Sequence, residues 1–94
     1  MAHSEEIPSV CSGTSVETMD GEMVLYRDAV KKMIYLNESA SLVFQMCDGK
    51  MSVREIIDLL AKAYPDDAQS IARDVYEAID YLVEEEVLRL ESQK

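Results

Sequence analysis

Residues 16–27 have the sequence VETMDGEMVLYR, in which two runs rich in apolar residues flank Asp20-Gly21. An Asp-Gly pair between two such runs is a strong hairpin signal, because a type I′ turn needs positive φ at both of its central residues. The stretch therefore predicts two antiparallel strands joined by a tight turn.

A third strand is expected directly after this hairpin. A second turn leads into KKMIYL at residues 31–36, and we expect the three runs to form an antiparallel meander with the third strand at one edge. Successive side chains of a strand point to opposite faces. We therefore assign Ile34 and Leu36 to the core and Met33 and Tyr35 to the other face.

The rest of the chain changes to helical periodicity, and three helices are expected. Asn37 is suited to cap the first, Ser52 and Glu55 form a capping box at the start of the second, and Pro65 ends that helix. Asp48-Gly49 is expected to end the first helix, with Gly49 in a left-handed conformation. The expected inward positions are Ala40, Val43, Phe44 and Cys47 in the first helix, Ile56, Ile57, Leu60, Ala63 and Tyr64 in the second, and Ile71, Val75, Ile79, Leu82 and Val83 in the third. The fold class is α+β, a three-stranded antiparallel sheet followed by a three-helix bundle.

The 94 residues are long enough for one domain. Residues 1–14 show no periodic pattern and are expected to form a flexible N-terminal arm, residues 15–91 the domain and residues 92–94 a tail. Residues 87–90 are expected to add a turn or a short strand. The N-terminal residues resemble no signal peptide, no apolar run is long enough to span a membrane, and the two cysteines form no metal-binding or disulfide pattern. These features indicate a soluble, cytoplasmic protein.

The balance of charge excludes several classes of partner. Nine basic residues against nineteen acidic ones give a formal net charge of −10. A field of this sign repels phosphate backbones and anionic lipids, so neither nucleic acid nor a membrane surface is expected as a partner.

An ordered set of motifs resembles the PqqD family. The third strand ends in Leu36-Asn37, Glu38-Ser39-Ala40 opens a helix, and Cys47-Asp48-Gly49 follows about ten residues later. Ser52-Val53-Arg54-Glu55-Ile56-Ile57 resembles the second helix of the family, Ala63-Tyr64-Pro65 its end, and the run from Asp74-Val75 to Leu82-Val83 the third helix. The chain has Glu86-Val87-Leu88 where many relatives carry a glycine after the third helix.

The resemblance implies a RiPP recognition element with a winged-helix-like fold, which holds the leader segment of a ribosomally made precursor peptide. Such a module is a non-catalytic peptide chaperone that presents the leader to a modifying enzyme. In pyrroloquinoline quinone (PQQ) biosynthesis this enzyme is a radical S-adenosylmethionine (SAM) protein, and other relatives serve lasso peptides and related pathways. The module itself requires no cofactor.

The resemblance also implies where the peptide binds. An extended peptide can add as a further strand to an exposed sheet edge. Lys31 and Lys32 are also typical of charges that guard such an edge, but the resemblance favours peptide addition. We expect the third strand to be this edge and the long helix to form the wall beside it, with Lys31, Lys32 and Arg73 facing acidic leader residues. The candidate peptide-binding residues are Lys31, Lys32, Met33, Ile34, Tyr35, Ala72, Arg73, Val75, Tyr76, Ile79 and Val83.

Three other classes of protein are alternatives to a peptide-binding module. No set of residues suggests an enzyme, because His3 lies in the expected arm and Cys47 falls on an apolar helix face, where a small buried hydrophobe is the better interpretation. An acyl carrier protein is an alternative, with Ser41-Leu42 in place of its Asp-Ser-Leu attachment motif. A winged-helix transcriptional regulator is another, but residues 66–94 hold nine acids and three bases, which would repel duplex DNA.

Overall fold

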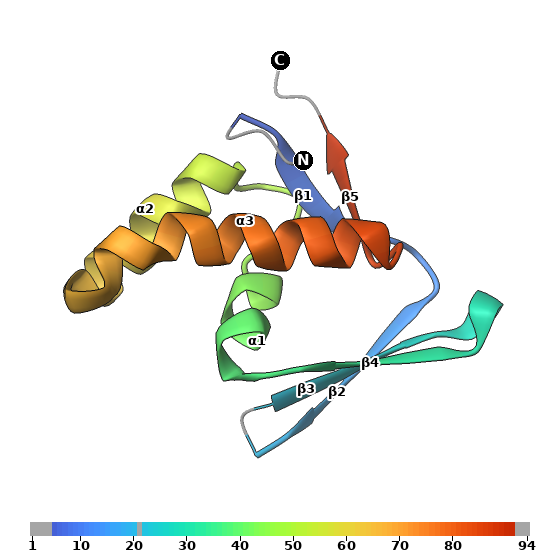
Figure 1. Cartoon of the computed structure of the whole chain (residues 1–94). Coiled ribbons are helices and arrows are strands. Elements are labelled where there is room, and N and C mark those ends of the chain that lie inside the picture. Colours follow the sequence, from blue (N-terminus) through green and yellow to red (C-terminus); the bar gives the residue numbers. More distant parts are fainter. Residues whose placement is uncertain (1–4, 21, 92–94) are drawn as a thin grey trace.

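The computed structural model describes residues 5–20 and 22–91. Within this part, β1 (Ile7–Val10) pairs with β5 (Leu88–Glu91), while β2 (Thr14–Met19), β3 (Glu22–Arg27) and β4 (Lys32–Leu36) form a second sheet (Figure 1). The helices are α1 (Glu38–Gln45), α2 (Val53–Ala63) and α3 (Ala68–Glu84), with short 3₁₀ turns η1 (Asp28–Val30) and η2 (Pro65–Asp67). The expected α+β class, a three-stranded antiparallel sheet followed by three helices, is confirmed.

The three-stranded sheet has the strand order β2-β3-β4, so β4 is an edge strand as predicted. The register pairs Leu25 of β3 with Ile34 of β4, and both side chains are buried together with Leu36. Helix α1 packs against β3 and β4 on this face (Figure 1). Met33 and Tyr35 occupy the other face and are 53% and 71% exposed, as strand alternation predicts.

Local sequence signals set the starts of the helices. The Asn37 side chain accepts a hydrogen bond from the backbone N–H of Ala40 at 2.8 Å. At the start of α2, the Ser52 side chain accepts from the N–H of Glu55, and the Glu55 carboxylate accepts from the N–H of Ser52. These contacts satisfy backbone donors that the first turn of a helix leaves unpaired, so the sequence-based assignment of both helix starts is confirmed.

The predicted inward faces are confirmed with two exceptions. The buried positions are Val43, Phe44, Cys47, Ile56, Ile71, Val75, Ile79 and Leu82, and Ala40, Ile57, Leu60 and Val83 are partly buried. Ala63 and Tyr64 are exposed, so their assignment to the core was wrong. Helix α2 ends at Ala63 and the backbone of Tyr64 leaves the helix at φ −131°, so the helical phase no longer directs the Tyr64 side chain inward.

Two of the predicted turns involve left-handed backbone. Asp20 has φ 50°, as the first central residue of a type I′ turn requires; Gly21 lies outside the described residues, so the turn type stays a prediction. Gly49 has φ 82°, but α1 ends earlier, with Met46 as its C-cap. The left-handed glycine therefore serves the link to α2, where its N–H donates to the carbonyl of Pro8 at 3.0 Å.

Residues 7–10, within the segment 1–14 that the sequence predicts as a flexible arm, instead form β1, which pairs with β5 in a two-stranded sheet. Pro8 is fully buried, and β1 pairs with β5 in an antiparallel register. Backbone hydrogen bonds tie the same segment to the rest of the chain, from Val53 N–H to the Glu6 carbonyl at 2.9 Å and from Cys11 N–H to the Val87 carbonyl at 2.7 Å. Residues 87–90 are predicted to add a turn or a short strand, and the structure has the strand β5 at Leu88–Glu91. The predicted tail, residues 92–94, and His3 lie outside the described residues.

The end of α3 is closed by a left-handed residue that is not glycine. Glu86 has φ 64°, its N–H donates to the Val83 carbonyl, and the N–H of Val87 donates to the Leu82 carbonyl at 2.9 Å. This is the hydrogen-bond pattern of a Schellman motif, and the side chains of Leu82 and Val87 are both buried beneath it. Glu86 thus stands at a position that favours glycine.

In the part of the chain that the structure describes, no helix is long and apolar enough to cross a membrane.

Candidate peptide-binding groove

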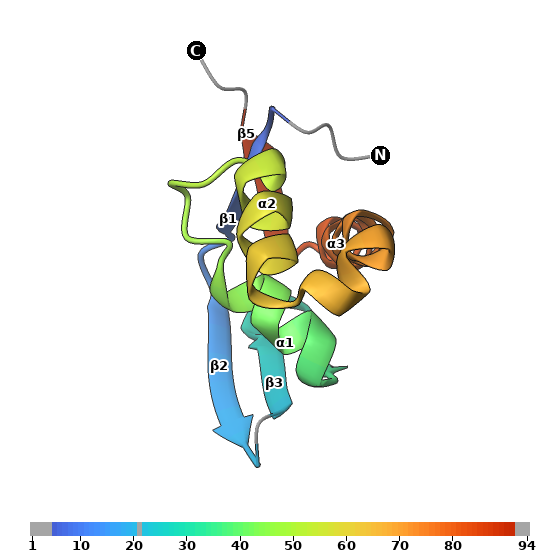
Figure 2. The same ribbon diagram turned by 90° about the vertical axis from the view of Figure 1, so that its left-hand side faces the viewer.

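The open edge of β4 lies beside α3. Lys32, the first residue of β4, forms an ion pair with Glu85 at the C-terminal end of α3. At the other end of the strand, Asn37 lines a cavity together with Asp74 and Ala78 from the middle of α3. The strand and the helix therefore run antiparallel along a shared groove. β2, the other edge of the sheet, lies on the side away from α3 (Figure 2).

The Lys32–Glu85 pair also sets the local electrostatics. The hydrogen bond to Glu85 raises the pKa of Lys32 above its usual value, and the charges of Glu85, Tyr81 and Glu86 add to this effect. The ammonium of Lys32 is half exposed and the Glu85 carboxylate largely covered. Lys32 is therefore held charged against the helix end, and Tyr81 lies on the side of α3 that faces the start of β4.

Most residues proposed for the site from sequence lie on the strand or in the core. Lys31, Met33 and Tyr35 are exposed with Lys32 along β4 and the turn before it. Ile34, Val75 and Ile79 are buried in the hydrophobic core and offer a ligand no accessible side-chain surface. Ala72, Tyr76 and Val83 are partly buried, and Arg73 is exposed.

The helix residues that face β4 differ from those proposed. With about 100° between successive residues of a helix, Ala72, Tyr76 and Val83 fall on one flank of the buried stripe of α3. The opposite flank carries Ala78 and Glu85, whose contacts with the cavity and with Lys32 place it toward β4. The residues of this flank, which the sequence analysis missed, are Asp74, Ala78, Tyr81 and Glu85. Their only sequence signal is a spacing of three and four residues. This spacing does not show which flank faces β4, because both flanks border the same apolar stripe.

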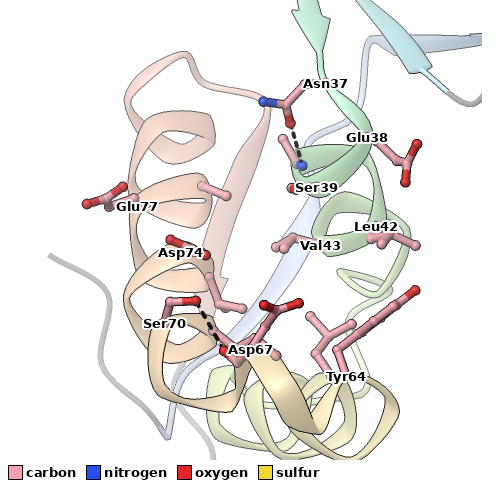
Figure 3. A pocket seen from close by; sticks show the side chains of 15 residues that line it. Asn37, Glu38, Ser39, Leu42, Val43, Tyr64, Asp67, Ser70, Asp74 and Glu77 are labelled. Atoms are coloured by element: carbon pink, nitrogen blue, oxygen red, sulfur yellow. Dashed lines mark hydrogen bonds between the residues drawn. The ribbon is translucent and has the colours of Figure 1, made fainter.

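A cavity of about 730 Å³ extends the groove beyond the end of β4. It lies between α1, α3 and the α2–η2 junction (Figure 3). Leu42, Val43, Leu60, Ile71 and Ala78 supply apolar lining, while Asn37, Ser39 and Ser70 are polar. Ligand pockets typically have volumes of roughly 300–1,000 Å³, so this cavity is large enough to hold peptide side chains.

The three basic residues expected to face an acidic ligand each have an acidic neighbour in the chain. Lys31 pairs with Asp28 at 3.5 Å, Lys32 with Glu85, and Arg73 with Asp74 at 3.8 Å. Arg73 and Lys31 are both strongly exposed, and exposed pairs of this kind contribute little to stability. The acidic neighbours nevertheless neutralise the three basic groups that were expected to face the ligand.

Cys47 and Ser41, two of the reactive groups considered from the sequence, are buried. Cys47 lies in the core with its thiol donating to the Val43 carbonyl at 3.2 Å, and burial raises its pKa to about 12. Its assignment as a small buried hydrophobe is confirmed. Ser41, the attachment residue of the acyl-carrier alternative, is 1% exposed, and its hydroxyl accepts from the Met23 N–H and donates to the Leu36 carbonyl. A prosthetic group has no access to such a hydroxyl. Among the described residues, no cluster of three or more His, Cys, Asp or Glu side chains is arranged to hold a metal ion.

The arrangement of a three-stranded sheet followed by three helices, with an open sheet edge beside the last helix, has counterparts among solved structures. Two solved structures share it with a TM-score of 0.76 each: TbiB1 in complex with the TbiA(beta) leader peptide, and a lasso peptide synthetase B1 complexed with the leader peptide. The first is 20% identical and covers 86% of this chain and 94% of its own; the second is 22% identical and covers 88% and 98%. At these identities the likeness concerns the fold.

Residues 22–88 match the family model described as coenzyme PQQ synthesis protein D (PqqD). The chain belongs to the PqqD family. Two curated relatives are each named PqqA binding protein: one from Methylococcus capsulatus is 34% identical over 64 residues, and one from Acinetobacter baylyi is 36% identical over 55 residues. The matched stretches cover 68% and 58% of this chain, and 63% and 52% of the relatives, so this chain spans less than two thirds of their length.

Proposed function

We propose that this protein binds the leader segment of a ribosomally made precursor peptide by adding it as a strand to the open edge of β4. The observation that carries the proposal is the position of that edge beside α3, with a cavity at one end of the groove. The names of the two curated relatives, which bind PqqA, and the leader peptides bound in the two related structures support it.

A peptide added to β4 would meet two environments. Side chains of an added strand alternate between the two faces of the sheet. Those on the inner face would lie against Ala78 and Tyr81 of α3, and those on the outer face would lie next to Met33 and Tyr35. Main-chain hydrogen bonds to β4 then provide affinity independent of sequence, and the two rows of side chains provide selectivity.

The site that we propose therefore differs in part from the one expected from the sequence. It retains Lys32, Met33 and Tyr35, whose side chains border the edge, and the backbone of Ile34. On the helix it uses Asp74, Ala78, Tyr81 and Glu85 in place of Ala72, Arg73, Val75, Tyr76, Ile79 and Val83.

We further propose that the protein acts without catalysis and presents the bound leader to a modifying enzyme in the cytoplasm. Membership of the PqqD family favours a radical SAM enzyme as that partner, in PQQ biosynthesis or a related peptide-modification pathway. The module then contributes by raising the local concentration of the precursor at the enzyme, and it needs no cofactor of its own.

The proposal is tested by calorimetric titration with the leader of the candidate precursor and with a scrambled peptide of the same composition. A disordered peptide loses conformational entropy on binding, so we expect a dissociation constant on the order of micromolar or below with a negative heat-capacity change. In a second assay, the rate of precursor modification by the candidate enzyme should rise when the protein is added. Equal affinity for the leader and the scrambled peptide would contradict the proposal.

A further inference from the structure

The cavity beyond the end of β4 differs in charge from the strand edge that it continues. Among the described residues that line it, four carry carboxylates and none is basic: Glu38, Asp67, Asp74 and Glu77. Asp74 has Arg73 as a neighbour at 3.8 Å, and within the described residues no ion pair involves the other three. The cavity therefore combines a lining that is about half apolar with a negative field.

Asp67 is the carboxylate most directed into this space. Figure 3 shows its side chain standing between α1 and α3, whereas Glu38 and Glu77 extend outward from the rim. Asp67 precedes α3 as its N-cap residue, but its side chain makes no capping hydrogen bond. Its carboxylate oxygens are thus not committed to the helix. The exposed ring of Tyr64, which also lines the cavity, offers a face that attracts cations.

The cavity is placed to receive the part of a bound peptide that extends past β4. Asn37 follows the last residue of β4 and lines the cavity, and Ala78 borders it from the same flank of α3 that faces the strand. A strand paired with β4 rises by about 3.3 Å per residue. A peptide that extends one or two residues past the position opposite Leu36 would therefore reach the cavity at Asn37. This continuity favours a peptide over a separate small molecule.

We propose that the cavity selects an apolar side chain of the leader peptide together with a neighbouring lysine or arginine, which pairs with Asp67. This inference rests on the proposed function, because it requires a peptide bound along β4. It reverses the expectation that the groove favours acidic leader residues, since the chain's own acids neutralise Lys31, Lys32 and Arg73. Charge complementarity of this kind mainly provides specificity between ligands.

The probe is a library of random twelve-residue peptides displayed on phage and selected on the full chain. Enriched peptides should carry a lysine or arginine within two positions of a large apolar residue. The most enriched peptide is then synthesised in two forms, with the basic residue and with glutamine in its place. NMR spectra of the isotope-labelled protein show whether each form binds along β4.

The matched variants are Asp67→Asn and Asp66→Asn, because both remove a carboxylate from the start of α3 but only Asp67 lines the cavity. Asp67→Asn should weaken binding of the basic peptide about two- to five-fold, as expected for loss of one exposed pair. The glutamine peptide should bind the wild type and Asp67→Asn with equal affinity. Asp66→Asn should bind both peptides like the wild type.

Different results would contradict the selectivity of the cavity and the addition of a strand to β4. If selected peptides shift the amides of β4 but tolerate the glutamine replacement and Asp67→Asn without loss, the inference about the cavity is wrong and strand addition stands. If the selection yields no peptide that perturbs β4, both the inference and the proposed function are contradicted. A preference for acidic residues among peptides bound at β4 would overturn the inference alone.

Discussion

Glu85 at the end of α3 forms an ion pair with Lys32 at the start of β4. The two residues join the longest helix of the protein to the edge strand of its sheet, although they lie far apart in sequence. Asn37, at the other end of the strand, faces the middle of the same helix across the cavity. The helix therefore runs antiparallel to the strand, and its side chains line the strand edge.

The first prediction concerns the protonation of Lys32. Its pKa is raised in the folded protein by Glu85, so the interaction is fully present below the ordinary lysine pKa of about 10.4. It is lost only as the pH rises through the raised value. In Glu85→Gln the pKa of Lys32 should fall toward the ordinary value, measured by NMR titration of the lysine side chains. An unchanged pKa in this variant would contradict the assigned pair.

The second prediction concerns the left-handed residue that closes α3. Glu86→Gly should raise the free energy of unfolding by about 1 kcal/mol, because glycine adopts positive φ without the steric penalty of a side chain. The matched control is Glu84→Gly in the last turn of α3, which should instead destabilise the protein by about 0.5–1 kcal/mol. Urea unfolding of both variants measures the difference. Destabilisation by both glycines would refute the left-handed assignment of residue 86.

The third prediction concerns the reactivity of Cys47. Because burial raises the pKa of its thiol to about 12, iodoacetamide at pH 8 should modify the half-buried Cys11 and leave Cys47 intact until the protein unfolds. The thiol favours the fold while it is protonated, so this contribution declines as the pH rises above the unfolded value of about 8.5. Mass spectrometry of peptides after a short reaction measures the order. Equal labelling of the two cysteines in the native state would contradict the buried position.

The fourth prediction concerns the outer face of the groove. Tyr35→Ala should weaken leader binding about two- to five-fold, as expected for loss of a cross-strand contact of up to ~1 kcal/mol. The folded state should be nearly unaffected, since the side chain is 71% exposed. Leu59→Ala on α2, which removes another exposed apolar side chain, serves as the control and should bind like the wild type. Titration calorimetry and thermal unfolding separate the two effects.

The features that the sequence predicted correctly depend on neighbouring residues. The caps at Asn37 and Ser52 join residues three positions apart, and the alternation of Ile34 and Tyr35 follows from the strand itself. Such signals lie within one turn or one strand and can be recognised without knowledge of the fold. For the same reason the order of the sheet and helices was accessible from the sequence.

Features that depend on contacts between residues far apart in the sequence could not be predicted from the sequence alone. β1 is a four-residue strand that contains a proline, and its partner β5 lies at the other end of the described chain, as the pairing of Ser9 with Arg89 illustrates. The side of α3 that faces the groove likewise depends on a contact between residues distant in sequence. Periodicity locates the buried stripe through Val75 and Ile79, but only the tertiary contact between Lys32 and Glu85 shows which flank faces β4.

Hydrogen exchange of the backbone amides along β4 tests the central claim most directly. In the complex with the leader peptide, alternate amides within residues 32–36 should exchange more slowly, because every second N–H of an edge strand points outward and donates a hydrogen bond to the added strand. The other edge strand, β2, provides the internal control and should keep its exchange rates. Slowed exchange along β2, or tight binding that leaves every amide of β4 unchanged, would contradict strand addition at β4.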